Sequence, residues 1–398
     1  MDYKNYINGK WVEAKSGKTF PVENPYNQQI ISHVPDSDNH DVNEAVSAAN
    51  TAYSDWHKMS ASERRDLMKE LANKSRENAN ELAKTISMEM GKPFPEALDE
   101  IDTVADFLEY YGELARDEVG RIVAPVDRNT MSLVRYESIG VIGCIIPWNY
   151  PMQIIGRTIG GALTMGNACV LKPGEEASLT SLKIGDLSLK AGFPPGVLNI
   201  VPGLGEEAGE ALLKHPGVSH YSFTGSTEIG VKVQQEAAKR AVPVTLELGG
   251  KSPQLVFSDA DIDKALPFLV NAAIQNAGQT CSAATRVLIE KPIFQELTER
   301  LAKGISSLRS GPALQDLECG PLISKVQKDR VEGFLQRARQ DGVEFLAEGS
   351  IVEDAPQGGN YVAPCMVGNV PPKHTPVSYT HLRAHETVLD LVCRLLLE

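Results

Sequence analysis

The sequence has no long apolar run and no excess of positive charge, and we expect no leader segment at its start. None of its apolar runs reaches the roughly 20 residues that cross a bilayer, and its first residues lack the apolar stretch of a signal peptide. Lys and Arg total 39 against 52 Asp and Glu, a formal net charge of −13. Nucleic acids and anionic membranes select clustered basic residues, so neither is an expected partner. The composition predicts a cytoplasmic protein that acts on small molecules.

The cysteines also lack the patterns that mark disulfides or metals. There are six, with no C-x-x-C pair and no histidine at the spacing of a zinc site. They are Cys144, Cys169, Cys281, Cys319, Cys365 and Cys393. We therefore expect no disulfide framework and no metal. Most cysteines in such a chain are small buried hydrophobes, so the sequence around each must identify a reactive one.

What the sequence does contain is the pattern of an α/β protein. Its 398 residues, 42% of them apolar, predict two or three domains. Residues 6–12 read as a hairpin with an Asn-Gly turn, and residues 41–120 are helical in pattern, with a capping box at Ser60–Glu63. From residue 139, short apolar runs ended by Gly, Pro or Asn alternate with helical stretches, which predicts a largely parallel sheet. A second such stretch places a domain boundary near residue 250.

A first candidate binding segment spans His220–Gly230. It predicts a strand that enters a glycine turn at Gly225 and Ser226 and then continues as a helix. Backbone N–H groups and the positive end of that helix could receive a pyrophosphate. The glycine spacing differs from the Gly-x-Gly-x-x-Gly fingerprint, so a plain strand-to-helix turn remains an alternative.

A candidate base follows in the segment Val244–Lys251. Its alternation turns Val244, Leu246 and Leu248 to one face and Glu247 to the other, just before a double glycine. A carboxylate at the end of a strand can act as a general base. A salt-bridged glutamate at a sheet edge is the alternative interpretation.

The candidate nucleophile is Cys281. The helix that precedes it is predicted to end at Gly278, which presents the cysteine on a turn. Backbone N–H groups of such a turn stabilise both a thiolate and a developing oxyanion. The sequence around it has no histidine and asparagine set of the papain kind.

Asn149 is a candidate hydrogen-bond donor. It follows an apolar strand and lies between Pro147 and Pro151, which would fix its side-chain amide. An ordinary turn asparagine is the alternative interpretation.

In combination these segments resemble the aldehyde dehydrogenase superfamily. The motifs are Pro-Trp-Asn-Tyr-Pro at 147, Leu-Lys-Pro-Gly-Glu at 171, Phe-Thr-Gly-Ser at 223, Leu-Glu-Leu-Gly-Gly-Lys at 246 and Gly-Gln-Thr-Cys at 278. They stand in the order and at the spacings of that family, and the resemblance covers residues 5 to about 377. Chance agreement of five such motifs is negligible.

The resemblance implies an α/β fold with a Rossmann-like NAD-binding domain and an α/β catalytic domain. It assigns residues 1–119 and 139–249 to NAD binding, 120–138 to oligomerisation strands, and 250–377 to an incomplete catalytic domain. A homo-oligomer is implied for a full-length parent.

The resemblance also implies a mechanism. Cys281 matches the nucleophile, and the Asn149 amide with the Cys281 backbone N–H would hold the oxyanion. A hydride then passes to the nicotinamide, and Glu247 would activate the water that cleaves the resulting thioester. A glutamate at position 247 favours the hydrolytic branch over relatives that transfer the acyl group to coenzyme A or phosphate.

Cofactor and substrate positions follow by the same resemblance. The implied cofactor residues are Trp148, Lys172, Glu175, Phe223, Gly225 and Ser226. Glu175 would accept from a ribose hydroxyl and repel a 2′-phosphate, which favours NAD, with NADP as an alternative because Lys172 is near. Tyr150 and Arg157 are the expected substrate residues. Arg157 suggests a semialdehyde that carries a carboxylate, although Gln275 and Thr158 depart from the pattern of such relatives.

Residues 378–398 do not continue the family pattern. After Thr375 the family continues into a Glu-Glu-Ile-Phe-Gly-Pro segment whose second glutamate holds the nicotinamide ribose, and Glu386 does not match it. The tail resembles translated sequencing-adapter sequence, so we expect a truncated or chimeric reading frame. The 398-residue chain is expected to aggregate or be nearly inactive, and a full-length parent to be active.

Two other functions remain as alternatives. A non-catalytic binding or structural protein on the same fold, or an inactive fragment, would bind the cofactor without turnover. A thiol hydrolase that uses Cys281, Asn149 and Glu247 would cleave esters without NAD.

Overall fold

The chain folds into two compact units, each built from several stretches of sequence. The computed structural model describes residues 3–117, 120–124 and 127–370. Among these, the first unit comprises residues 3–23, 30–89 and 97–247, and the second comprises residues 24–29, 90–96 and 248–370. The predicted foreign tail, residues 378–398, and positions 371–377 of the predicted catalytic domain lie outside the described residues.

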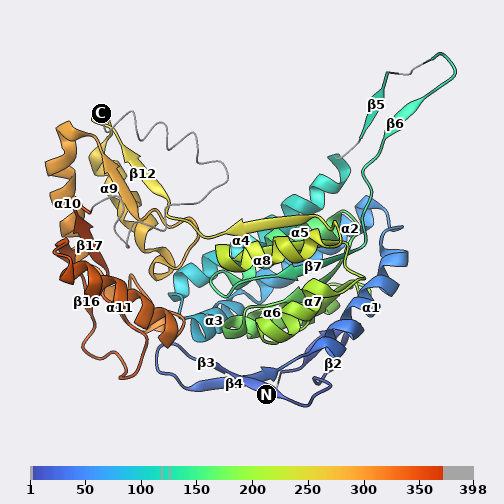
Figure 1. Ribbon diagram of the computed structural model, residues 1–398, viewed down its shortest axis with the longest axis horizontal. Helices are drawn as coiled ribbons and strands as arrows, with labels where there is room; N and C mark the ends of the chain where they lie inside the picture. Colours follow the sequence, from blue (N-terminus) through green and yellow to red (C-terminus); the bar gives the residue numbers. More distant parts are fainter. Residues whose placement is uncertain (1–2, 118–119, 125–126, 371–398) are drawn as a thin grey trace. The chain divides into compact units, whose positions relative to one another are not determined.

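A seven-stranded sheet forms the centre of the first unit, in the order β11-β10-β7-β8-β9-β1-β2 (Figure 1). Its strands are β1 (Asn5–Ile7), β2 (Lys10–Val12), β7 (Val141–Ile145), β8 (Ala168–Lys172), β9 (Leu198–Ile200), β10 (His220–Gly225) and β11 (Val244–Leu248). Strands β10, β7, β8 and β9 run parallel, and β1 is antiparallel to its neighbours β9 and β2. Every residue of β8 is buried, as expected for a parallel strand covered on both faces. The α/β prediction is confirmed.

Two groups of helices accompany this sheet. The helices of the first unit are α1 (Asn39–Trp56), α2 (Ala61–Glu77), α3 (Ala79–Met90), α4 (Phe94–Asp117), α5 (Pro151–Thr164), α6 (Ser178–Lys190), α7 (Glu210–Lys214) and α8 (Thr227–Ala238), with short helical turns η1 (Glu175–Ala177) and η2 (Gly205–Gly209). The last residue of α3, Met90, and the first three residues of α4, 94–96, belong to the second unit. α5 and α6 contact each other and α2, whereas α1 contacts α7, which contacts α8. Right-handed crossovers place α5 and α6 on one face and α7 and α8 on the other. No helix in the described ranges is both long and apolar enough to cross a membrane.

Two local predictions are confirmed at the residue level. The β1–β2 hairpin turns at Asn8 and Gly9, whose φ angles of 53° and 69° are those that an Asn-Gly turn supplies. Helix α2 begins with the predicted capping box, in which the Ser60 hydroxyl accepts from the Glu63 amide and the Glu63 carboxylate accepts from the Ser60 amide.

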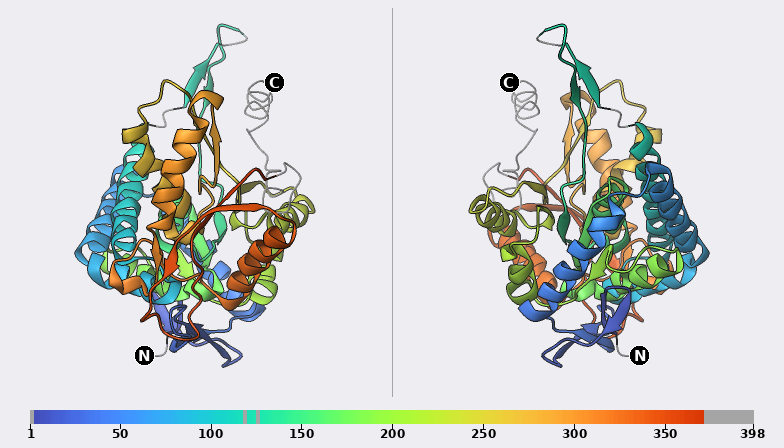
Figure 2. Two further views of the ribbon diagram at one scale, coloured as in Figure 1. Left: turned by 90° about the vertical axis from the view of Figure 1, so that its left-hand side faces the viewer. Right: turned by 90° about the vertical axis from the view of Figure 1, so that its right-hand side faces the viewer.

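A two-stranded hairpin extends from the first unit beyond the sheet (Figures 1 and 2). It consists of β5 (Arg121–Val123) and β6 (Ser132–Val134), paired antiparallel. Ile122, Met131 and Leu133 are 77%, 76% and 58% exposed. These apolar side chains lie in residues 120–138, the range predicted to join copies of the chain.

A separate two-stranded sheet in the first unit pairs β3 (Thr19–Glu23) with β4 (Ile30–Pro35).

The second unit is also α/β. Its elements are β12 (Pro253–Val256), α9 (Ile262–Ile274), η3 (Gln275–Gly278), β13 (Arg286–Ile289), η4 (Lys291–Ile293), α10 (Phe294–Ser306), β14 (Arg309–Ser310), η5 (Ala313–Gln315), α11 (Lys325–Gln340), β15 (Glu344–Glu348), β16 (Ser350–Ile351) and β17 (Cys365–Gly368). β12 and β13 are parallel, and β15 and β17 are antiparallel. Its core gathers Val256, Leu269, Leu297 and Leu301 between β12, α9 and α10.

Candidate active site

Most predicted residues of the first unit lie at or just after the carboxyl ends of its parallel strands; Arg157, in α5, and Glu247, in β11, are the exceptions. From β7 the chain moves outward to β8 and β9, and then returns to place β10 on the other side of β7. The order in which strands are added to the sheet therefore reverses between β7 and β10, and open α/β sheets bind their ligands at such a point. Trp148, Asn149 and Tyr150 follow β7, and Ser226 follows β10.

The loop that carries Asn149 leads directly into α5. The amides of Met152 and Gln153, in the first turn of α5, donate to one oxygen of Glu100 at 2.8 and 3.0 Å. Glu100 belongs to α4 and is 3% exposed. A buried carboxylate there satisfies two orphan donors and complements the helix dipole, so Glu100 fixes the start of α5. Glu100 is not among the residues predicted from the sequence.

The loop after β8 holds the predicted ribose site together. The buried Lys172 ammonium lies 2.9 Å from a Glu175 oxygen, and the Gly205 amide donates to that same oxygen at 2.6 Å. Burial raises the pKa of Glu175, but the Lys172 charge and these hydrogen bonds outweigh it, so the pKa lies below its usual value. A Cβ on Gly174 would meet the Trp148 amide nitrogen at 2.8 Å, so glycine lets the β7 and β8 loops touch.

The segment after β10 has the predicted strand-turn-helix form. Ser226 caps α8 with its hydroxyl, which accepts from the Ile229 amide at 3.3 Å. Phe223 is buried, and a Cβ on Gly225 would lie 2.6 Å from its ring, which explains glycine at that position. The first turn of α8 therefore presents its amides at the edge where β7 and β10 end.

Two further predicted residues meet across this unit. Arg157 of α5 approaches Glu247 of β11, with Nη2 and Oε1 3.8 Å apart. Their side chains are 37% and 55% exposed, so this is a loose, solvated pair. Glu247 therefore matches the salt-bridge interpretation in geometry while remaining accessible to water, and the guanidinium predicted for substrate faces the predicted base.

Cys281 belongs to the second unit, whereas the other predicted site residues belong to the first. It lies beyond η3 and is exposed, while Cys144, Cys169 and Cys319 are buried. Burial raises the pKa of Cys319 to about 12 and also raises the pKa of Cys169 and Cys365. Among the described thiols Cys281 is the one that is exposed, and Cys365 is partly buried. No group of metal-ligating side chains occurs among the residues that the structure describes.

A second buried carboxylate supports the helix after β8. Glu89 of α3 is fully buried and accepts from the amides of Leu179 and Thr180, at the start of α6, at 2.8 and 3.0 Å. The Thr180 hydroxyl also donates to it. Burial raises the pKa of Glu89 to about 7, despite these donors.

Replacing Glu89 with glutamine should remove a pH dependence of stability. The folded-state pKa is raised from 4.5 to about 7, so the group's contribution is complete below pH 4.5 and is lost as pH rises through 7. Between pH 5 and pH 8 the free energy of unfolding of the parent, measured with urea, should therefore fall by roughly 2–3 kcal/mol more than that of Glu89→Gln. If the difference in unfolding free energy between the parent and Glu89→Gln were the same at pH 5 and pH 8, the raised pKa of Glu89 would be contradicted.

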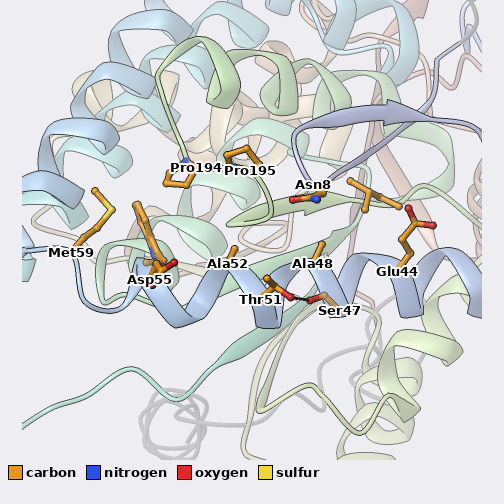
Figure 3. Close-up of a pocket in the computed structure, with 12 residues that line it drawn as sticks. Asn8, Glu44, Ser47, Ala48, Thr51, Ala52, Asp55, Met59, Pro194 and Pro195 are labelled. Atoms are coloured by element: carbon orange, nitrogen blue, oxygen red, sulfur yellow. Dashed lines mark hydrogen bonds between the residues drawn. The ribbon is translucent and has the colours of Figure 1, made fainter.

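A cavity of about 510 Å³ lies away from these residues. It runs along α1 beside Pro194 and Pro195, and its lining includes Glu44 and Asp55 (Figure 3). None of the predicted catalytic, cofactor or substrate residues lines it.

Comparison with known proteins gives consistent matches. The model of the "Aldehyde dehydrogenase family" matches residues 11–378. The peroxisomal aminoaldehyde dehydrogenase 2 of Pisum sativum is 40% identical over 374 residues, covering 92% of this chain and 74% of the relative. The mitochondrial succinate-semialdehyde dehydrogenase of Oryza sativa is 36% identical over 365 residues, covering 92% and 69%. The structure of betaine aldehyde dehydrogenase from Staphylococcus aureus in complex with NAD+ has a TM-score of 0.91 at 30% identity, covering 95% and 75%.

Proposed function

Since the chain belongs to the aldehyde dehydrogenase family, we propose that it oxidises an aldehyde to the carboxylic acid with NAD as hydride acceptor. The observation that carries this proposal is the exposed thiol of Cys281 on the turn after η3, while Cys144, Cys169 and Cys319 are buried. A thiol must be accessible to attack an aldehyde carbon. Family membership confirms the resemblance inferred from the five motifs.

The proposed reaction assigns one step to each residue. The Cys281 thiolate attacks the aldehyde carbon, and the Asn149 amide with the Cys281 N–H holds the resulting oxyanion. NAD, when bound, supplies the hydride acceptor for collapse to a thioester. Glu247 then takes a proton from water, which cleaves the thioester and releases the acid. The solvent exposure of Glu247 supports its access to that water.

The loops after β7, β8 and β10 suit a dinucleotide. One Glu175 oxygen is bound by Lys172 and Gly205, which fixes the carboxylate and leaves its other oxygen for a ribose hydroxyl. Trp148 and the Ser226 turn would flank the pyrophosphate at the start of α8. This arrangement supports NAD over NADP for this chain, and the Staphylococcus aureus relative binds NAD+ in its structure.

Arg157 supports a substrate with a second, anionic end. Its guanidinium is partly exposed and pairs only loosely with Glu247, so a carboxylate of the substrate could replace that pair. The Oryza sativa relative named for succinate semialdehyde points to the same class. We therefore propose a semialdehyde, with Tyr150 beside the substrate.

The test uses a hybrid chain, defined as residues 1–377 followed by the carboxyl-terminal segment of the Pisum sativum relative. We expect the hybrid chain to form NADH with succinic semialdehyde at least about tenfold faster, in kcat/KM, than with an uncharged aldehyde of equal length. The 398-residue chain should be nearly inactive, because residues 378–398 do not match the Glu-Glu-Ile-Phe-Gly-Pro segment whose second glutamate would hold the nicotinamide ribose. NAD binding without NADH formation by the hybrid chain would favour a non-catalytic protein, and ester cleavage independent of NAD would favour a hydrolase.

The β5–β6 hairpin supports a homo-oligomer. Its exposed Ile122, Met131 and Leu133 form an apolar surface of the kind that joins subunits. Light scattering of the hybrid chain should give a mass of at least two chains, and a monomer would contradict this proposal.

A further inference from the structure

The turn before Cys281 has a backbone that side chains rarely adopt. Asn276 and Ala277 have φ angles of 54° and 55°, and Gly278 follows at 75°. Left-handed conformations are disfavoured for residues with a Cβ, and two in succession persist only where surrounding groups hold them. The sequence places a glycine at only one of the three positions. The turn therefore needs support from outside its own residues.

That support comes from a distant carboxylate. The backbone N–H of Asn276 donates to Glu96 Oε2 at 2.8 Å, and the two residues are 180 positions apart in the chain. Asn276 is 1% exposed and Glu96 is partly buried, so this hydrogen bond is partly shielded from water. Glu96 lies in the first turn of α4, where the helix dipole favours a carboxylate. The same carboxylate adds to the effect of burial on Cys319, whose pKa is raised to about 12.

Gln279 closes the other side of the turn. Its amide and its side-chain nitrogen both donate to the Asn276 carbonyl, at 3.0 and 3.2 Å, and the Asn276 side chain donates back to the Gln279 carbonyl at 3.2 Å. Gln279 Oε1 accepts from the Ile323 amide at 2.9 Å. The turn is thus bound on one side to Glu96 and on the other to Ile323, both in the second unit, and Cys281 lies two residues after Gln279.

We propose that Glu96 is a positioning residue for Cys281, acting through the Asn276 amide to hold the left-handed turn that orients the thiol and its neighbouring amides. This inference rests on the proposed function insofar as Cys281 is the nucleophile of that reaction. A charge-assisted hydrogen bond is strong enough to select one backbone conformation over relaxed ones. Small displacements of a reacting group lower the reaction rate by large factors, so loss of the Glu96–Asn276 hydrogen bond should slow attack by the thiol.

Alkylation of the 398-residue chain by iodoacetamide tests the role of Glu96 without aldehyde or NAD. The thiolate displaces iodide to form a carbon–sulfur bond, and peptide mass spectrometry gives the rates at Cys281 and at Cys365 in the same sample. Glu96→Ala should lower the Cys281 rate about tenfold and leave the Cys365 rate unchanged. Glu96→Gln, which keeps an acceptor oxygen, should stay within about threefold of the parent.

Two further variants separate positioning from general damage. Asp99→Ala removes an exposed carboxylate from the same helix and should leave both rates unchanged. Adding Ala277→Gly to Glu96→Ala should restore part of the Cys281 rate, because glycine adopts the left-handed conformation without support. An unchanged Cys281 rate in Glu96→Ala, or an equal slowing in Asp99→Ala, would overturn the inference. Absence of NADH formation by the hybrid chain would overturn the proposed function instead, and the alkylation rates would still decide the role of Glu96.

Discussion

Replacing Cys281 with serine is expected to lower NADH formation by the hybrid chain at least about 10³-fold, because a serine hydroxyl at neutral pH is a far weaker nucleophile than a thiolate. The loss should appear in kcat, since the substitution removes the attacking atom and leaves the loops after β7, β8 and β10 intact. Absorbance of the reduced cofactor gives the rate. A variant that keeps more than a tenth of the parent rate would show that another group attacks the aldehyde.

Cys365→Ser is the matched control. Cys365 begins β17 in the second unit, is half-buried and has a pKa raised by burial, so it is a poor nucleophile. The rate of NADH formation by Cys365→Ser should stay within about twofold of the parent rate. Quenching of tryptophan fluorescence by NAD should be equal in both variants, which separates loss of chemistry from loss of cofactor binding.

The sequence predicted those parts of the fold that depend on near neighbours along the chain. The Asn8-Gly9 turn and the Ser60–Glu63 capping box are set by residues within three positions of each other, and both are as expected. The order of the strands could not be predicted in this way. β1 lies beside β9 because Tyr6 pairs with Ile200, and that choice depends on surfaces formed by residues far apart in the chain.

The same distinction applies to the candidate site. The motif residues were found because their spacing is local, but the three glutamates that support them were not. Glu89, Glu96 and Glu100 act on α6, on the Cys281 turn and on α5, at separations of 90, 180 and 52 positions. A signal was present for one of them, because Glu100 shares the apolar face of α4 with Ala97 and Val104. A carboxylate on such a face needs donors from elsewhere, and here they are the free amides of a helix start.

The Arg157–Glu247 pair connects the proposed base with the proposed substrate site. Arg157 Nη2 and Glu247 Oε1 lie 3.8 Å apart. If a substrate carboxylate binds Arg157, the guanidinium is shared or withdrawn, and Glu247 becomes free to turn toward water. The choice of substrate and the timing of hydrolysis would then depend on one cation, which an uncharged aldehyde cannot engage.

Replacing Glu247 with glutamine should separate the two halves of the reaction. Attack by Cys281 and hydride transfer do not need this carboxylate, so each active site of the hybrid chain should form one NADH in a rapid burst. Thioester hydrolysis does need it, and the steady rate should fall about 10²–10⁴-fold. Stopped-flow absorbance measures the burst, and intact-protein mass spectrometry should detect the acyl group on the peptide that contains Cys281.

Glu332→Gln, an exposed glutamate of α11, is the matched control for the same change in charge and should show neither burst nor slowing. Slow turnover without a burst would mean that Glu247 acts before hydride transfer, as the group that deprotonates the thiol. An unchanged steady rate would return Glu247 to the role of a salt-bridged glutamate at the edge of the sheet, and its pairing with Arg157 would then serve only to join α5 to β11.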